Sequence, residues 1–241
     1  IVILAAGQGK RMKSALPKVL QPLAGKPLLR HVLETALALA PKAEPIVVIG
    51  HGAEQVQSFL VHLASLEVRF RNVKTVLQKE QKGTGHALLQ ALPKLNRLLP
   101  TLVLYGDVPL CSKETLKKLV RLSDGAVGLL THRMQNPHGY GRIVRDIDGN
   151  IDAIVEEKDA NLAIRSIQEI NTGIMVLPTK QLGKWLKGIK AKNAQGEYYL
   201  TDVITMAVKA GVPVRSAQAT HDHEILGVNS RAQLAELERV L

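Results

Sequence analysis

The sequence contains one cysteine and few aromatic residues: two Phe, four Tyr and one Trp in 241 residues. A single cysteine excludes an internal disulfide and suits a reducing compartment, and Cys111 itself is typical of a small buried residue that follows a strand. A nucleic-acid module would need stacking aromatics or zinc-ligand spacing, and neither pattern is present. We therefore expect no nucleic-acid partner.

Long apolar runs are also missing. No run approaches the roughly 18 residues that a membrane helix needs, and no charged and then apolar secretory segment opens the chain. With 46% hydrophobic and 22% charged residues, the composition is that of a globular protein of one or two domains. We expect a cytoplasmic protein without a membrane span.

Acidic residues are absent from the first part of the chain, where the first is Glu34. The apolar run 1–4 predicts a buried parallel strand, and Gly7 and Gly9 follow it. The cations of this segment are Lys10, Arg11, Lys13 and Lys18. A sharp turn that exposes backbone N–H groups, together with positive side chains that no acidic residue neutralises, predicts a site for several phosphates.

Two better-known phosphate loops do not fit this segment. A dinucleotide-binding loop would need glycine in place of Met12 and an acidic residue about 20 positions later, which is absent. A P-loop would need a glycine at Leu20 and Ser or Thr in place of Pro27 around the Gly25-Lys26 pair. The remaining alternative for this segment is a tight turn whose lysines are only solvated. Many of the other cations that contribute to the net charge of +11 lie in helix-like stretches, where solvated side chains are usual.

Strands and helices alternate in the first half of the sequence. Apolar runs predict strands over 1–4, 45–50, 75–78, 101–107 and 126–134, and helical spacing predicts helices over 27–40, 53–66, 86–95 and 112–122. Repeated strand–helix units imply a doubly wound, mainly parallel sheet whose site lies at the carboxyl edge of the strands.

The second half changes character at about residue 136. Asp148-Gly149 separates two alternating runs within 141–157, which predicts a β-hairpin; we expect it to form a small sheet that covers the substrate. A strand over 170–178, helices over 181–190 and 199–210, a strand over 212–219 and a final amphipathic helix over 230–241 follow.

Eight sequence blocks carry a family resemblance over nearly the whole chain. They are LAAGQGKRM with LPK (4–18), QKEQKGTGHA (78–87), LYGDVPL (104–110), GYGRIV (139–144), IVEEKDA (154–160), EINTGIM (169–175), NAQGEYYLTD (193–202) and GVNSR (227–231). In this order and spacing the chain resembles the uridyltransferase domain of the bifunctional bacterial N-acetylglucosamine-1-phosphate uridyltransferase/glucosamine-1-phosphate acetyltransferases.

The resemblance implies a fold and a reaction. The fold would be α/β, with a Rossmann-like doubly wound, mixed but mainly parallel sheet of the nucleotide-diphospho-sugar transferase type and a small β-hairpin lid. The reaction would transfer uridylyl from UTP to N-acetylglucosamine-1-phosphate with Mg²⁺, releasing pyrophosphate and giving UDP-N-acetylglucosamine for cell-wall precursors.

The resemblance also assigns roles to residues. Nucleotide contacts fall on Leu4, Ala5, Ala6, Gly7, Gly9, Lys10, Arg11, Lys18, Gln78, Gln81, Gly83 and Thr84. Sugar contacts fall on Tyr105, Gly106, Asp107, Gly141, Glu156, Asn171, Thr172 and Asn229. Arg11, Lys18 and Asp107 would be catalytic, and Asp107 and Asn229 would bind the metal.

Without the resemblance, three of these residues have ordinary interpretations. Asp107 ends a strand beside a glycine, as a metal ligand or a turn former would. Glu156 could be one of many solvated hairpin carboxylates, and Asn229 could be an N-cap before the last helix.

The sequence departs from the family pattern in two places. Ser230 stands where the family more usually has a second asparagine, and the hairpin could differ slightly in length.

We expect a nucleotidylyltransferase domain over 1–229 and, over 230–241, the start of a helix that connects to a hexapeptide-repeat acetyltransferase domain absent from this trimmed chain. The full-length family members would form homotrimers, whereas this chain would be a monomer with a frayed last turn.

Other functions remain open from the sequence. A nucleotidylyltransferase with a dTDP-, CDP- or GDP-linked product is one, and a non-catalytic nucleotide-sugar sensor or a basic nucleic-acid binder is another. The joint presence of Arg11, Lys18, Asp107 and Asn229 disfavours a sensor without catalytic activity.

Overall fold

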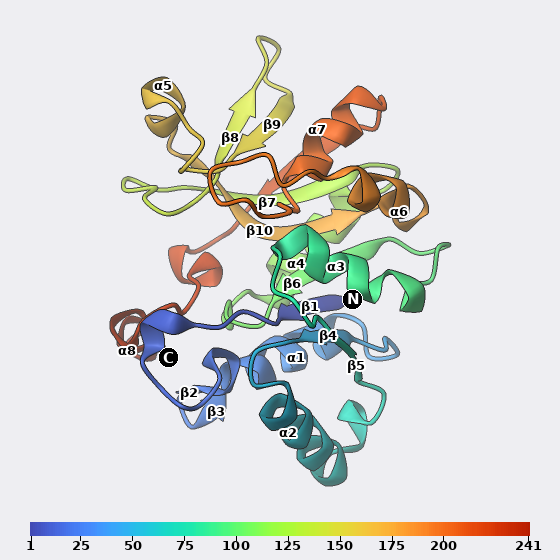
Figure 1. The fold of residues 1–241 in the computed structure, drawn as a ribbon, viewed down its shortest axis with the longest axis vertical. Coiled ribbons are helices and arrows are strands. Elements are labelled where there is room, and N and C mark those ends of the chain that lie inside the picture. The colour runs from blue at the N-terminus through green and yellow to red at the C-terminus, as the bar shows by residue number, and fades with distance from the viewer.

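The computed structural model describes residues 1–241, apart from the side chain of Lys10. Its main body is a nine-stranded sheet with helices on both faces, and the strand order along the main path is β11-β7-β10-β6-β1-β4-β5 (Figure 1). The predicted phosphate contact of Lys10 lies outside the described residues.

The first half forms the parallel part of the sheet. Its strands are β1 (Val2–Ala5), β4 (Ile46–Ile49), β5 (Lys74–Leu77) and β6 (Thr101–Tyr105), and its helices are α1 (Leu28–Leu39), α2 (Ala53–Leu66), α3 (Thr84–Ala91) and α4 (Lys113–Leu122). β1 lies between β4 and β6 and is parallel to both, so the chain winds outward in one direction and then in the other. In such a sheet the crevice for a ligand opens at the carboxyl end of the central strand.

The second half adds antiparallel strands. β10 (Glu169–Leu177) lies between β6 and β7 (Val127–Arg133) and is antiparallel to both, while β11 (Val214–Gln218) is parallel to β7. The helices of this half are α5 (Leu162–Arg165), α6 (Thr179–Gly188), α7 (Asp202–Lys209) and α8 (Arg231–Glu238). The expected mixed, mainly parallel α/β fold is confirmed.

The predicted hairpin is present as β8 (Arg142–Arg145) and β9 (Ile151–Val155), at the top of Figure 1. Asp146 shapes its turn, because its Oδ1 accepts from the backbone N–H groups of Asp148 and Asn150 at 3.0 and 2.8 Å. The hairpin is not isolated: Ile170 of β10 pairs with Arg142 of β8, so the two strands branch from the main sheet.

Short elements connect these units. They are the two-stranded β2 (Pro22–Leu23) and β3 (Lys26–Pro27), and the 3₁₀ helices η1 (Lys10–Met12), η2 (Lys18–Leu20), η3 (Val68–Phe70), η4 (Leu92–Lys94) and η5 (Asp222–Ile225). Two to four residues are too few for hydrophobic periodicity, so the sequence pattern did not predict them.

Two apolar layers flank the sheet. Alternate residues of β1 face opposite sides: Ile3 packs with α1, α2 and α4, whereas Val2 packs with α3, α6 and α7. Both faces are therefore buried, which explains why the central strands are continuous apolar runs.

A third, smaller apolar cluster holds the opening loop, residues 6–18, against the end of the chain. It contains Met12 and Leu28 together with Val228 and Leu237, all of them buried. Of the apolar stripe expected on the last helix, Leu237 is buried and Leu234 partly so, whereas Leu241 is 62% exposed. Figure 1 shows α8 beside the opening loop.

Among the described residues, no helix has both the length and the apolar character to cross a membrane.

Candidate active site

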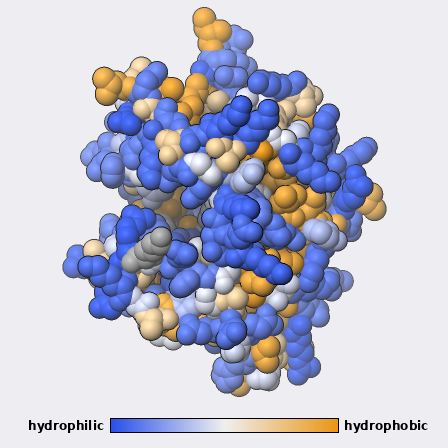
Figure 2. Space-filling model, viewed as in Figure 1, coloured by the Kyte–Doolittle hydropathy of each residue, from blue (hydrophilic) through white to orange (hydrophobic). Residues whose placement is uncertain are grey.

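A cavity of about 640 Å³ opens at the carboxyl ends of β1 and β6. It is lined by Leu4, Ala5, Ala6, Gly7, Gln8, Lys18, Val19, Gln78, Gln81, Gly83, Thr84, Ala87, Tyr105, Asp107 and Glu197. The face seen in Figure 2 is mainly hydrophilic and is hollowed on its left side, between the part that carries β8 and β9 and the part that carries the opening loop. Most of the predicted nucleotide-binding residues thus meet in one place.

Glycines allow the opening loop to pack closely. Gly9 has φ +60°, and a Cβ on it would lie 2.7 Å from the Cβ of Lys18, so a side chain at position 9 would displace Lys18. After β4, a Cβ on Gly50 would likewise collide with Ala6, and a Cβ on Gly52 would collide with Pro17. The loop is further fixed where the backbone N–H of His51 donates to the carbonyl of Ala6 at 3.1 Å.

Lys18 joins the two predicted metal ligands. Its Nζ donates to the carboxylate of Asp107 and, at 3.0 Å, to Oδ1 of Asn229. The side chains of Lys18 and Asp107 are only 12% and 15% exposed, so this ion pair is partly shielded from water. Residues 122 positions apart in the sequence (229 − 107) therefore present two oxygens to one cation.

This arrangement fits a divalent cation that is bound together with a phosphorylated substrate. The oxygens of Asp107 and Asn229 already converge on a positive charge, the Lys18 ammonium. In the described part of the chain no three His, Cys, Asp or Glu side chains form a cluster, so a cage made by protein alone is not present there. Mg²⁺ commonly takes one or two protein ligands and completes its shell with water and substrate phosphates.

Two amide side chains that are expected to contact the nucleotide, those of Gln78 and Gln81, line the cavity. Gln78 is buried, and its Nε2 lies 3.1 Å from the carbonyl of Gly83 and 3.0 Å from Nδ1 of His86. Nε2 of Gln81 donates to the backbone carbonyl of Gln78 at 3.0 Å. The Thr84 hydroxyl accepts from the backbone N–H of Leu200 at 3.0 Å.

A second segment supports this wall. The backbone of Tyr198 pairs with that of residues 82–85: its N–H donates to Lys82 and its carbonyl accepts from Gly85, both at 2.8 Å. Gly83 has φ +108°, and a Cβ there would lie 2.6 Å from the carbonyl oxygen of Tyr198. The glycines of the block 78–87 are therefore needed for the block 193–202 to lie against it.

Tyr105 is held by an irregularity in β10. The register of β10 against β7 shifts between Asn171 and Met175, and Oδ1 of Asn171 accepts there from the N–H of Gly173 at 3.1 Å. Gly173 has φ +86°, and a Cβ on it would be 2.7 Å from the Tyr105 ring. Burial, followed by the charges of Glu156 and Asp107, raises the pKa of Tyr105, so its phenol stays protonated.

Thr172 also stabilises the register shift in β10. Its hydroxyl donates to the carbonyl of Leu130 at 2.8 Å and lies 3.2 Å from the N–H of Ile174. The side chain is buried and its hydroxyl is used within the chain, so Thr172 shapes β10 beside the site.

Glu156 and Gly141 lie together at the base of the hairpin. Oε1 of Glu156 accepts from the Thr201 hydroxyl at 3.0 Å, and a Cβ on Gly141 would approach its Oε2 to 3.3 Å. Burial raises the pKa of Glu156, although the Thr201 bond opposes that effect. Glu156 is therefore not one of the freely solvated hairpin carboxylates.

Several predicted residues stand outside the cavity lining. They are Gly9, Arg11, Gly106, Gly141, Glu156, Asn171, Thr172 and Asn229. Arg11 is exposed on η1, while Gly106 is buried beside Ala5 and Val19. Asn229 and Gly9 still reach the cavity through their contacts with Lys18.

Comparison with known proteins decides the family. The model of the MobA-like NTP transferase domain matches residues 1–169. The chain belongs to this family.

Curated relatives of this NTP transferase extend the match to the whole chain. The bifunctional protein GlmU of Burkholderia orbicola is 57% identical over 241 residues, covering 100% of this chain and 51% of the relative. The same protein of Burkholderia vietnamiensis is 58% identical with the same coverage. The chain thus spans about half the length of the curated relatives it matches, and the resemblance to the bifunctional family is confirmed.

A solved structure shows the same fold. The crystal structure of a UDP-glucose pyrophosphorylase complexed with UDP-glucose superposes with a TM-score of 0.80 at 20% identity, covering 99% of this chain and 96% of the other. The nucleotide-diphospho-sugar transferase type of fold, predicted from the motifs, is confirmed. A nucleotidyltransferase domain of this kind suggests a divalent metal.

Four residues of the cavity wall in this NTP transferase were not predicted from the sequence: Gln8, Val19, Ala87 and Glu197. Gln8 lies between the two loop glycines, and Glu197 lies in the matched block 193–202, so both positions carried a signal. Cys111 is buried as expected, and burial raises the pKa of its thiol to about 12, which argues against a nucleophile.

Proposed function

We propose that this domain transfers uridylyl from UTP to N-acetylglucosamine-1-phosphate, giving UDP-N-acetylglucosamine and pyrophosphate. The observation that carries the proposal is the cation-centred contact of Lys18 with Asp107 and Asn229 at the wall of the cavity. The identity of 57% to GlmU proteins supports it. Supply of cell-wall precursors in the cytoplasm is part of the same proposal, and the single buried cysteine suits that compartment.

The chemistry requires charge control more than proton transfer. A phosphate monoester has its second pKa near 6, so the attacking group is already mainly ionised at neutral pH. The difficulty is to bring the anionic sugar phosphate up to the anionic triphosphate of UTP and to release pyrophosphate, which is also an anion. Positioning and cationic groups are the means by which proteins lower such a barrier.

We assign the phosphates to the opening loop. Leu4, Ala5, Ala6 and Gly7 would border the nucleotide, and Gly9, Lys10 and Arg11 would contact the outer phosphates. Lys18 would turn from Asp107 to the α-phosphate and stabilise the charge that develops there. The close packing of Gly9 on the Lys18 side chain supports this pairing of loop and lysine.

We assign Mg²⁺ to Asp107 and Asn229. When bound, the ion would neutralise phosphate charge and help to align the two reacting groups. Asp107 contributes the only full negative charge of the pair, so its carboxylate would hold the cation while the neutral amide of Asn229 fixes its direction.

We assign the base to Gln78, Gln81, Gly83 and Thr84, and the amino-sugar to the opposite side. There Tyr105, Gly106, Gly141, Asn171 and Thr172 would shape the site, and Glu156 would accept from sugar hydroxyls. The neighbouring contact between Glu156 and Gly141 supports a common surface for these two residues.

The domain limits belong to the proposal as well. Residues 1–229 would form the uridyltransferase unit, and 230–241 would begin the link to an acetyltransferase domain in a trimeric full-length protein. The chain's coverage of 51% of its relatives is consistent with this division.

A panel of nucleotides tests the proposal. Pyrophosphate release from UTP, dTTP, CTP and GTP, each with N-acetylglucosamine-1-phosphate and Mg²⁺, should be fastest with UTP. Equal rates with CTP would contradict the assignment of Gln78 and Gln81 to the base, and no release from any nucleotide would contradict the reaction itself.

A further inference from the structure

We propose that His86 orients the side-chain amide of Gln78 and thereby makes the site select uracil over cytosine. The inference rests on the proposed function, because it concerns the base of the nucleotide that the domain uses. It adds a positioning residue that does not itself line the cavity.

The carbonyl of Gly83 fixes which end of the Gln78 amide faces it. A carbonyl oxygen can only accept, so the Gln78 atom 3.1 Å away must be the donor Nε2. Since Gln78 is 3% exposed, turning its amide would place two acceptors face to face without water to separate them. The Gly83 carbonyl is itself fixed, because it also accepts from the backbone N–H of Ala87 at 3.0 Å.

His86 takes the second proton of the same amide. Its Nδ1 lies 3.0 Å from Nε2 of Gln78, so Nδ1 acts as the acceptor and the ring proton is on Nε2. The amide of Gln90 lies 3.2 Å from that other nitrogen. The same Gln90 nitrogen donates to the backbone carbonyl of His86 at 3.2 Å and so does not need the ring nitrogen as an acceptor. The contact with buried Gln78 therefore decides which ring nitrogen carries the proton.

Both protons of the Gln78 amide are therefore used, and its oxygen is left over. Among the described residues no hydrogen bond is made to Gln78 Oε1, and this atom is not sealed from solvent. Because Gln78 lines the cavity, the oxygen is presented to a ligand as a fixed acceptor.

A fixed acceptor distinguishes the two pyrimidines. Uracil carries a proton on N3, whereas cytosine carries a lone pair there, so the same oxygen attracts one base edge and repels the other. Sites built to hydrogen-bond a particular group commonly reject an analogue that cannot make the bond by factors of about 10² or more. Without His86, an amide that turned its donor toward cytosine would face one acceptor, the Gly83 carbonyl, instead of two, so the turned orientation would cost less.

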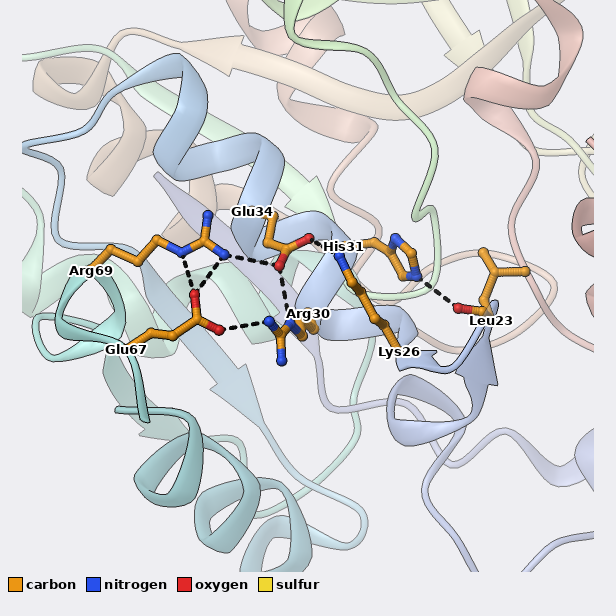
Figure 3. Close-up of polar contacts among 7 residues, drawn as sticks. All are labelled: Leu23, Lys26, Arg30, His31, Glu34, Glu67 and Arg69. Carbon is orange, nitrogen blue, oxygen red and sulfur yellow. Dashed lines mark hydrogen bonds and ion pairs between the residues drawn. The ribbon is translucent and has the colours of Figure 1, made fainter. Parts of the chain in front are cut away.

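Two substitutions of His86 test the inference against a matched control. His86→Phe keeps a planar ring but removes the acceptor, and His86→Asn can place an amide oxygen where Nδ1 was. His31→Phe serves as the control, because half-buried His31 lies on α1, where its Nε2 contacts the carbonyl of Leu23 at 2.9 Å, outside the cavity lining (Figure 3). The measurement is kcat/KM and the binding constant for UTP and for CTP, in each variant.

The expected result is a change of selectivity. His86→Phe should lower the UTP-to-CTP ratio of kcat/KM by about tenfold or more, His86→Asn should restore most of it, and His31→Phe should leave it at the wild-type value. If His86→Phe does not fold, His86→Ala takes its place.

Other results would overturn the inference. An unchanged ratio in His86→Phe, or an equal loss with both nucleotides, would show that His86 has only a structural role, while uridylyl transfer by the wild type would still stand. A wild type that turns over no UTP would instead contradict the proposed function, and the two binding constants would still report on His86.

Discussion

The ammonium of Lys18 lies between the oxygens of Asp107 and Asn229, and each of the three residues comes from a different part of the chain. Asp107 could be suspected from the sequence because it ends a strand at the expected edge of the sheet. Asn229 could not, because nothing in its local pattern separates a ligand from an N-cap. Only the family resemblance pointed to it, and the fold brings it to the site.

The first prediction concerns this pair. Asp107→Ala should lower kcat by about three orders of magnitude or more, because a metal contribution of several kcal/mol is lost and each ~1.4 kcal/mol is tenfold in rate. Asn229→Ala should be milder, since it removes a neutral ligand. Steady-state rates at saturating Mg²⁺ measure both, and near-wild-type activity of Asp107→Ala would be inconsistent with the mechanism.

A second prediction separates backbone strain from displacement of Lys18. Gly9→Ala and Gly25→Ala both place a side chain at positive φ, which costs about 1–2 kcal/mol. The added Cβ meets Lys18 in the first case and open space in the second. Gly9→Ala should lose at least as much thermal stability as Gly25→Ala, but only Gly9→Ala should lose most of its kcat. Equal activities would show that Lys18 does not depend on the loop.

At the scale of elements, amphipathic helices and buried strands could be predicted well. The helix expected over 53–66 agrees with α2, and the hairpin turn at Asp148-Gly149 is in place. Shorter elements, such as β2, β3 and α5, and the pairing of strands far apart in the sequence could not be predicted. No local pattern shows that Ile170 pairs with Arg142, so the hairpin could not be predicted as a branch of the main sheet.

An ion-pair network joins α1 to its neighbours (Figure 3). The carboxylate of Glu34 lies 3.0 to 3.1 Å from Lys26, Arg30 and Arg69, and Glu67 pairs with both arginines. Burial raises the pKa of Glu34, but the bonds from Arg30 and Lys26 outweigh it and bring the pKa below the ordinary value of 4.5. A lowered carboxyl pKa means that the stabilisation is present above pH 4.5 and is lost as the pH falls below it.

The third prediction follows from that sign. Glu34→Gln should lower Tm at pH 7 by about 2–4 °C, the shift expected for a loss of about 1 kcal/mol in a chain of this size. The difference from the wild type should shrink below pH 4.5 and in high salt. Glu238→Gln, exposed on α8, is the control and should leave Tm unchanged. A difference that persists at pH 3 would mean that packing, and not charge, is responsible.

At the scale of the whole molecule, the order of strands was the least predictable feature. The alternation of strands and helices indicated a doubly wound sheet, but the position of β10 between β6 and β7, antiparallel to both, has no local signal. The same placement brings Gly173 to Tyr105, so the proposed sugar contacts of Tyr105 and Asn171 could be predicted only through the family resemblance.

The fourth prediction concerns assembly. The buried Leu237 of α8 packs on the opening loop of its own chain, which favours a self-contained unit. We expect this chain to be monomeric at micromolar concentration, with a mass near 26.2 kDa by light scattering. A stable trimer of this chain in solution would contradict this expectation.

The most direct test of the central claim is to identify the products by ³¹P NMR. The purified domain is incubated with UTP, N-acetylglucosamine-1-phosphate and Mg²⁺, and Asp107→Asn serves as the matched control because it keeps the shape of the side chain while removing its charge. The account predicts that the wild type forms the diphosphate signals of UDP-N-acetylglucosamine and pyrophosphate in equal amounts, and that the variant forms almost none. Release of inorganic phosphate without a nucleotide sugar, or equal product from Asp107→Asn, would contradict it.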